Sequence, residues 1–361
     1  MIQTVEIVEG STPLVVPAEH SDGGPGKITG GVFFNGKMAF NRDVSVMFLR
    51  ALGGVSAVDA MSATGARAVR LANEVPGCEV VANDSSRLAH GFISRNIELN
   101  SLTNCRASNK DLRVLLAEES FGYVDIDPFG SPMPFLHAAI GGCAKGGVLA
   151  VTATDTAPLA GAHRKKCERR YGSRPIRGAM CHEGGLRILL SSLARELAKF
   201  DRGMMPLLCH SSDHYYRVYV RVTDTASHAD ETLSKLIYMG VDPDTRQRLV
   251  SNALSKETPH GPFWGGRLFD DSILGRLDPK GVEEGRRCEK SIALWKSELD
   301  RIPYVYCADE MSSHAGVGSP RFADLLDRLS EIGPVSPTHI SPTSFRTEIP
   351  ATEIVAVLRS M

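Results

Sequence analysis

Residues Asp127-Pro128-Phe129-Gly130 combine a carboxylate, a rigid turn residue and an aromatic ring, directly after the apolar segment 121–126. That segment has the composition of a buried strand, so we expect the carboxylate at the end of the strand beside a flat stacking surface. The combination suits methyl transfer to an exocyclic amine of a nucleobase, since this weak nucleophile must be held in line with the donor and must lose a proton. Asp127 would accept N–H hydrogen bonds, Pro128 would stiffen the turn and Phe129 would clamp the base. The alternative is an ordinary strand-to-loop turn with a capping Asp.

The loop 58–67 follows an expected strand and opens an expected helix, which is the position of a nucleotide-type cofactor loop. It contains one glycine, Gly65, whereas a dinucleotide-binding loop has three, and this disfavours NAD. S-adenosylmethionine has no pyrophosphate and needs only one close approach of the backbone. It is therefore the expected cofactor.

Acidic residues follow three successive expected strands. Asp59 belongs to the first, and Asp84 ends the second, where a carboxylate can accept from both ribose hydroxyls. Asp111 closes the third, where it would meet the adenine amino group beside the backbone N–H of Leu112. Each acid could instead cap a helix, which is the commoner role of an Asp after a strand. Three of them at successive strand ends favour a cofactor site.

Segment 31–43 precedes the first of these strands and combines aromatic residues, glycines and an arginine. We expect it to cover the cleft, with Arg42 pairing the carboxylate of the cofactor. The alternative is that Phe33, Phe34 and Phe40 only seal the edge of the sheet.

Segment 163–177 is strongly basic, with seven Lys or Arg residues against one Glu and with a Tyr between them, although the net charge of the whole chain is −1. Localised positive charge beside a catalytic cleft is what docking of a phosphate backbone needs. The alternative is an ordinary solvated face. The residues expected to bind the backbone of a nucleic acid are Arg164, Lys165, Lys166, Arg169, Arg170 and Arg174.

Short apolar segments alternate with helical patterns between residues 55 and 222, as in a parallel sheet wound with helices. Segments 206–209 and 215–222 look like a closing antiparallel pair. The expected class is α/β, with a Rossmann-like class I methyltransferase domain whose seven-stranded, mostly parallel sheet ends in an antiparallel hairpin. The other expected strands are 57–60, 79–83, 106–110, 123–126 and 148–152, and the expected helices are 65–72, 86–99 and one that carries the Leu stripe 186–197.

The alternation stops near residue 224, and the remaining chain is richer in charge. Helices are expected there at 286–299 and 321–330. We therefore divide the chain into residues 1–224, a cofactor-binding catalytic domain with an N-terminal extension, and residues 225–361, a smaller α+β domain.

The composition, with 361 residues of which 42% are apolar and 23% charged, allows two domains with their own cores. Residues 1–20 lack a basic and then apolar leader, and no stretch has the ~18 apolar residues of a membrane span, so we expect a cytoplasmic protein. Eight cysteines lie far apart and form no Cys-x-x-Cys pair, so they are expected in the core of a reduced protein, and no metal is expected. No segment indicates an obligate protein partner.

A set of short segments, in order along almost the whole chain, resembles one family, the tRNA guanine-26 N2-dimethyltransferases. The matching segments are 33–35 with Met38, 41–43, 59–65, 125–132, 151–155, 161–163, 213–217, 261–265 and 341–347. The resemblance implies formation of N2,N2-dimethylguanosine in tRNA by two successive transfers from S-adenosylmethionine. It implies cofactor contacts at Arg42, Arg67, Asp84, Asp111 and Leu112, a catalytic carboxylate at Asp127, and rings holding the guanine at Phe33 and Phe129.

The implied substrate sets a physical requirement, because a base stacked inside folded tRNA must be extruded to reach the donor. The basic segment and the C-terminal domain are the expected sources of the binding energy. Some family members have paired cysteines before the Gly-Pro-x-Trp segment that suggest a zinc site, whereas residues 255–260 of this chain contain none. A structural metal is therefore not expected.

Two other functions remain open. A methyltransferase acting on N6 of adenine, or on another amino nitrogen, would use a similar turn of acid, proline and aromatic residue. A catalytically silent RNA-binding module would retain the fold, but the acids at the expected cofactor positions and at Asp127 oppose it.

Overall fold

The computed structural model describes residues 2–19 and 31–361 of the chain. Contacts divide it into two compact units, and neither is one continuous segment of chain. Unit 1 consists of the described residues up to Thr154, Tyr219–Thr223 and Asp271–Ile292, and unit 2 of Asp155–Val218, Asp224–Asp270 and Ala293–Met361. This division differs from the expected functional boundary at residue 224, which stays a prediction.

A seven-stranded sheet forms the framework, with the strand order β5-β4-β3-β6-β7-β9-β8. Its neighbours from β5 to β7 pair in parallel, and two residues, Asp213 and His214, connect β8 to β9. The strands are β3 (Ser56–Asp59), β4 (Glu79–Asn83), β5 (Cys105–Ser108), β6 (Phe121–Ile126), β7 (Cys143–Ala153), β8 (Arg202–Ser212) and β9 (Tyr215–Asp224). The expected α/β class and its mostly parallel seven-stranded sheet are confirmed.

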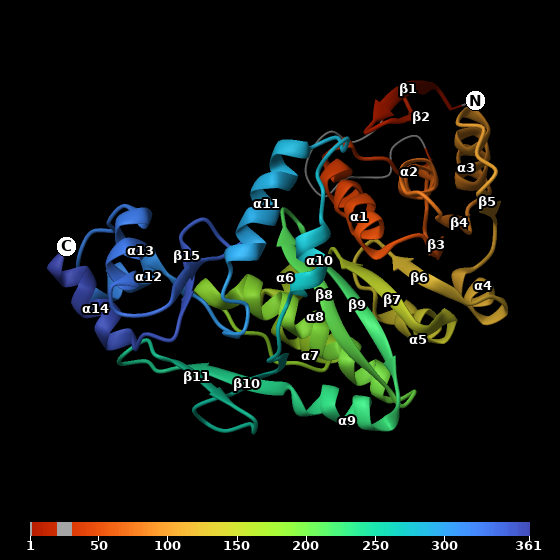
Figure 1. Cartoon of the computed structure of the whole chain (residues 1–361). Coiled ribbons are helices and arrows are strands. Elements are labelled where there is room, and N and C mark those ends of the chain that lie inside the picture. The colour runs from red at the N-terminus through yellow and green to blue at the C-terminus, as the bar shows by residue number, and fades with distance from the viewer. Residues whose placement is uncertain (1, 20–30) are drawn as a thin grey trace. The chain divides into compact units, whose positions relative to one another are not determined.

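Helices cover both faces of the parallel strands in unit 1 (Figure 1). The 3-10 turn η1 (Gly36–Met38) leads into α1 (Ala39–Leu52), and α1, α2 (Ala66–Glu74) and α3 (Arg87–Leu99) lie along one face. The other face carries α4 (Leu112–Glu118) and α5 (Met133–Gly142). Ser86 caps α3 by accepting from Ala89 N, and Asp111 caps α4 by accepting from Arg113 N, so polar residues after strands set where these helices begin.

An N-terminal hairpin that was not among the expected elements completes unit 1 together with α10 (Asp271–Arg276) and the first part of α11 (Gly285–Ser297). Strand β1 (Thr4–Glu9) pairs antiparallel with β2 (Thr12–Pro17). Leu14 and Val16 of β2 are buried against Phe34 and Val69. The hairpin is therefore packed into the core of this unit.

Unit 2 contains helices that flank two small antiparallel sheets. The sheets have the orders β11-β10-β12 and β13-β15-β14. The strands of these two sheets are β10 (Leu236–Val241), β11 (Arg248–Ser251), β12 (His260–Trp264), β13 (Tyr306–Cys307), β14 (Val335–Pro337) and β15 (Ser344–Thr347). Its helices are α6 (Thr156–Leu159), α7 (Arg164–Tyr171), η2 (Gly178–Met180), α8 (Cys181–Ala198), α9 (Ala226–Ser234), α12 (Ala308–Ala315), α13 (Phe322–Ser330) and α14 (Ala351–Ser360).

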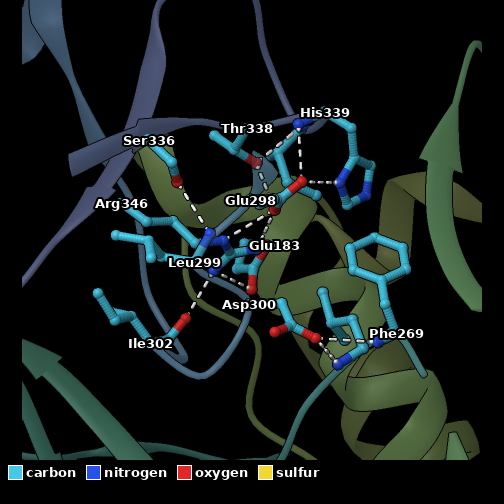
Figure 2. A network of polar contacts seen from close by, with 12 residues as sticks. Glu183, Phe269, Glu298, Leu299, Asp300, Ile302, Ser336, Thr338, His339 and Arg346 are labelled. Carbon is cyan, nitrogen blue, oxygen red and sulfur yellow. Dashed lines mark hydrogen bonds and ion pairs between the residues drawn. The ribbon is translucent and has the colours of Figure 1, made fainter. Parts of the chain in front are cut away.

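A buried ionic network joins distant parts of the chain within unit 2 (Figure 2). Arg346 of β15 donates to both oxygens of Glu183 on α8, at 2.9 and 2.8 Å, and its Nε donates to Glu298 at 2.8 Å. All three side chains have zero exposure. Burial alone would raise the pKa of Glu183, but attraction by Arg346 and Arg187 outweighs it and holds that pKa below its ordinary value.

No helix in residues 2–19 and 31–361 is both long and apolar enough to cross a lipid bilayer.

Candidate active site

A cavity of about 310 Å³ in unit 1 opens at the C-terminal ends of the parallel strands, the usual place for a ligand in such a sheet. Residues after β3, β4, β6 and β7 line it together with the segment that leads into α1. The lining residues are Gly31, Val32, Phe33, Phe34, Asn35, Met38, Arg42, Asp59, Met61, Ser62, Ala63, Thr64, Ala66, Arg67, Asp84, Ser86, Ala89, Asp127, Pro128, Phe129 and Thr154. Residues Asp127-Pro128-Phe129, called the acid corner below, and the expected cofactor loop 58–67 thus line the same cavity.

Asp127 is held by Arg67 of α2, whose Nη2 donates to its Oδ2. Nη1 of the same guanidinium donates to Asn41 Oδ1 at 2.7 Å and to Ser45 Oγ at 2.6 Å, which fixes its orientation. Asp127 keeps a side-chain exposure of 19%, against 7% for Arg67. An ion pair on one side and solvent access on the other suit an ionised carboxylate that meets a ligand.

Two further acids lie close to this pair. Asp125 is fully buried, accepts from Tyr123 Oη at 2.7 Å, and has its Oδ2 3.8 Å from Arg67 Nε. Burial raises the pKa of Asp59 to about 7, while attraction by Arg67 opposes this rise and the charges of Asp125 and Asp127 add to it. Two carboxyl groups that line the cavity, Asp59 and Asp127, and the buried Asp125 thus surround one guanidinium.

Two aromatic rings meet at the cavity, Phe33 and Phe129, with centroids 4.8 Å apart and planes at 84°. This is an edge-to-face contact. Phe129 is 58% exposed, an unusual state for a large apolar side chain, and so has surface available for a planar ligand. Two hydrogen bonds hold the residue after Phe129 in place. Gly130 N donates to Thr154 Oγ1 at 2.6 Å, and Gly130 O accepts from Thr154 N at 3.0 Å.

The loop after β3 approaches the cavity with its backbone. Ala63 has a φ of 49° and Gly65 a φ of 80°, and a Cβ at Gly65 would lie 3.2 Å from Ile93 Cγ1. The single glycine therefore serves the left-handed turn and close packing at the start of α2. Asp84 fixes the loop, because its Oδ2 accepts from Ala63 N and its Oδ1 from Ser86 N, both at 2.9 Å.

Not every expected cofactor residue lies at this cavity. Asp111, Leu112 and Gly65 are absent from its lining in the described part of the chain. Asp111 caps α4 and accepts from Arg113 N at 2.8 Å and Nε at 2.9 Å, and these bonds lower its pKa to about 2. This is the capping role that the sequence left open as the alternative.

Arg42 lines the cavity and forms an ion pair that the sequence did not indicate. Its Nε and Nη2 donate to Glu9 Oε1 and Oε2 at 2.6 and 2.5 Å, and Nη2 also donates to Asn35 O at 3.1 Å. Glu9 ends β1 just before a glycine, and the alternation of apolar residues in segment 5–9 was the signal for a strand there. The partner itself could not be found from sequence, since it lies 33 residues away.

The basic segment forms α7 and the residues after it, in unit 2. Arg164 pairs with Glu168 of the same helix at 2.7 Å and Arg170 with Asp155, which precedes the segment, at 3.0 Å, so part of the charge of the segment is neutralised. A surface hollow is lined by residues 163–166, 168 and 169. Arg174 belongs to another hollow, and its backbone N and O pair with Gly261 O and N at 2.8 and 2.9 Å.

Within residues 2–19 and 31–361, no three His, Cys, Asp or Glu side chains are grouped so that they could hold a metal ion. All eight cysteines are free thiols, and most are buried.

Comparison with known proteins identifies the family. A family model described as N2,N2-dimethylguanosine tRNA methyltransferase matches residues 25–359. The tRNA (guanine(26)-N(2))-dimethyltransferase of Thermococcus kodakarensis is 36% identical over 383 residues and covers 100% of both chains, and that of Methanothermobacter thermautotrophicus is 37% identical over 385 residues and covers 99% of both. The structure of Trm1 from Pyrococcus horikoshii with S-adenosyl-L-methionine matches with a TM-score of 0.90 and 33% identity, over 98% of this chain and 99% of that one. This chain therefore belongs to the N2,N2-dimethylguanosine tRNA methyltransferase family.

Proposed function

We propose that this protein transfers two methyl groups in succession from S-adenosylmethionine to the exocyclic N2 of guanine 26 in tRNA. The relatives that match its whole length are tRNA (guanine(26)-N(2))-dimethyltransferases, and the similar Trm1 structure holds S-adenosyl-L-methionine. The observation that carries the proposal is the shared cavity, in which the acid corner and the loop after β3 face the same space.

In this proposal the guanine stacks on Phe129 and donates an N2–H to Asp127. Holding the amine in line with the sulfonium methyl replaces a bimolecular encounter by an oriented one. The methyl carbon bonds to N2 as its bond to sulfur breaks, adenosylhomocysteine departs with the electron pair, and the N2 proton passes to Asp127 and then to solvent. Arg67 forms an ion pair with Asp127 and so holds this side chain at the cavity.

The second transfer has its own requirement, since N2-methylguanine keeps one N–H. That hydrogen suffices for the bond to Asp127, provided that the first methyl group points away from the donor. The exposure of Phe129 supports this orientation of the first methyl group, because the side chain of Phe129 is open to solvent and leaves room beside the base.

For the cofactor, we assign the ribose to Asp84 and the methionine carboxylate to Arg42, with Asp59 and Arg67 beside the reacting end. Gly65 shapes the loop, and Asp111 with Leu112 is assigned to the adenine. Asp84, Arg42, Asp59 and Arg67 line the cavity. The adenine assignment is supported by the position of Asp111 after the third expected strand and by the family resemblance.

For the tRNA, we assign backbone binding to the basic residues of 164–174 and to the domain 225–361. Lys165, Lys166 and Arg169 carry most of the charge that is not paired within α7. The proposed location is the cytoplasm, the compartment expected from the sequence.

The test is to incubate tRNA with the protein and S-adenosylmethionine carrying a labelled methyl group, and to identify the labelled nucleosides by mass spectrometry. Label is expected first in N2-methylguanosine and then in N2,N2-dimethylguanosine. A transcript with adenine in place of guanine 26 should remain unlabelled. Label in N6-methyladenosine would instead support the alternative methyltransferase, and tRNA binding without any transfer would support the silent RNA-binding module.

A further inference from the structure

We propose that Glu9, at the end of β1, is a positioning residue of the cofactor site, which orients Arg42 for the carboxylate of the methionine part of S-adenosylmethionine. The inference rests on the proposed function, because it requires this carboxylate to meet Arg42. It adds the N-terminal hairpin to the site.

The geometry between Glu9 and Arg42 fixes the plane of the guanidinium. Both carboxylate oxygens are used, Oε1 with Nε at 2.6 Å and Oε2 with Nη2 at 2.5 Å. The side-chain exposures are 8% for Arg42 and 4% for Glu9, so water competes little for this pair. A two-point contact of this kind removes rotation about the last bonds of an arginine, which a single hydrogen bond does not.

The pairing leaves one end of Arg42 for a ligand. A guanidinium has five N–H donors, and three of them are taken by Glu9 and by Asn35 O. Both remaining donors are on Nη1, which has no acceptor among the described residues, although Arg42 is buried and lines the cavity. Nη1 is not among the fully buried donors that lack a partner, so it keeps accessible surface and can donate to an acceptor in the cavity.

Glu9 is itself held in place by a second arginine. Arg70 Nη1 donates to Glu9 Oε1 at 2.8 Å, and Arg70 also pairs with Asp43 and Glu74, each at 2.8 Å. Burial alone would raise the pKa of Glu9, but attraction and hydrogen bonds from Arg42 and Arg70 lower it overall. Glu9 therefore stays ionised at neutral pH and holds Arg42 as a charged partner.

The hairpin that carries Glu9 is tied to the cofactor loop as well. Asn96 of α3 accepts from Val15 N at 2.6 Å, and its Nδ2 donates to Val15 O at 3.0 Å and to Thr64 O at 2.9 Å. One side chain thus binds β2 and the loop after β3 together. The turn at Gly10 fits closely too, since a Cβ there would lie 2.6 Å from Arg70 Nη2.

Two ligands distinguish an effect on the orientation of Arg42 from a general loss of protein stability. Adenosylhomocysteine contains the methionine-type carboxylate, whereas 5′-methylthioadenosine lacks the whole amino-acid group. In the full-length protein, Glu9→Gln should raise the Kd of adenosylhomocysteine about tenfold, the effect of losing one charge-assisted contact. The Kd of 5′-methylthioadenosine should change by less than about twofold. Glu6→Gln, on the exposed side of the same strand, is the matched control and should leave both values unchanged.

Calorimetric titration of both ligands decides the inference. Equal weakening of both ligands by Glu9→Gln, or of neither, overturns it. On an Arg42→Ala background, Glu9→Gln should have no further effect on adenosylhomocysteine, and an undiminished further loss also contradicts the proposal. If Glu9→Gln does not fold, Arg42→Lys, which keeps the charge but loses the fork, must show the same selective loss. Failure of the unmodified protein to bind either ligand would instead refute the proposed function.

Discussion

At the level of single residues, the site separates its acids by their surroundings. Asp127 is partly exposed and paired with Arg67, whereas Asp59 is 2% exposed and its pKa is raised by burial to about 7. The partly exposed, paired carboxylate can contact a ligand, whereas the buried one holds a proton more tightly than an ordinary Asp does. The same side-chain type therefore has two different properties within one cavity.

The raised pKa of Asp59 predicts a pH dependence of stability. The ordinary value is 3.8, so between about pH 4 and 7 the folded protein keeps a proton on Asp59 that the unfolded chain has released. The free energy of unfolding should therefore fall as pH rises through this window, by up to about 1.4 kcal/mol per pH unit, and level off above it.

Asp59→Asn should remove this contribution. Urea unfolding of both proteins at pH 5, 6, 7 and 8 is the measurement, and the difference between their unfolding free energies should shift with pH up to about 7. A difference that stays constant over this range would show that Asp59 does not titrate there.

Three residues that the sequence analysis placed after strands, Asp84, Asp127 and Phe129, line the cavity, whereas Asp111 does not, and the roles of all four stay predictions. Prediction from the sequence could not find side-chain partners that meet only after folding. Glu9, Asn41 and Ser45 orient Arg42 and Arg67, but no spacing in the sequence marks them.

At the level of elements, α7 carries five basic residues against one acid. Its Lys165, Lys166 and Arg169 accompany Arg164, which is paired within the helix to Glu168. A helix of this charge binds phosphates by releasing condensed counterions, so affinity depends on salt.

Replacing Arg164, Lys165 and Lys166 with Ala should weaken tRNA binding and flatten its salt dependence. The slope of log Kd against log salt should fall by about two to three, in line with the charges removed. Binding should be measured at several salt concentrations with unlabelled tRNA and fixed protein.

The control removes equal charge elsewhere, with Arg106, Lys110 and Lys199 replaced by Ala. These side chains are exposed and each is paired with a nearby acid. The control should keep the slope of the unmodified protein. If the slope of log Kd against log salt falls equally in both triple variants, the overall charge of the protein causes the effect and α7 is not a specific binding surface.

Several parallel strands were predicted closely from the sequence, although β7 begins at Cys143, five residues before the expected start at 148. β4 occupies the expected residues 79–83, and β3, β5 and β6 lie within two residues of the expected bounds, because buried parallel strands are continuous apolar segments between turn residues. The β1–β2 hairpin and the small sheets of unit 2 were not predicted. Their strands are short or partly exposed, so their apolar pattern is weak.

At the level of the whole molecule, each unit is assembled from separated segments of chain, which no composition shift near residue 224 could reveal. Long-range ionic contacts hold such segments together within a unit. In unit 2, Arg346 lies between Glu183 and Glu298, which are 115 positions apart in the sequence.

Arg346→Ala should destabilise unit 2 strongly, because it removes the cation that lies between two buried carboxylates, Glu183 and Glu298. Removing one partner of a buried pair costs about 3–5 kcal/mol. Both tryptophans of the chain, Trp264 and Trp295, are buried in unit 2, so urea unfolding followed by tryptophan fluorescence reports on this unit.

Arg328→Ala is the matched control, since Arg328 forms an exposed pair with Glu331 on the surface of the same unit. It should change the free energy of unfolding by no more than about 0.5 kcal/mol. Equal effects of the two substitutions would contradict the role given to the buried network.

The central claim is that one cavity holds the methyl donor and the extruded guanine, with Asp127 as the group that receives the N2 proton. Single-turnover transfer of a labelled methyl group to tRNA, with protein and cofactor in excess, measures this step directly. Asp127→Asn should slow the transfer by at least about 100-fold, while the Kd values for tRNA and S-adenosylmethionine change by less than about twofold. Transfer by Asp127→Asn at a rate close to that of the unmodified protein would contradict the claim.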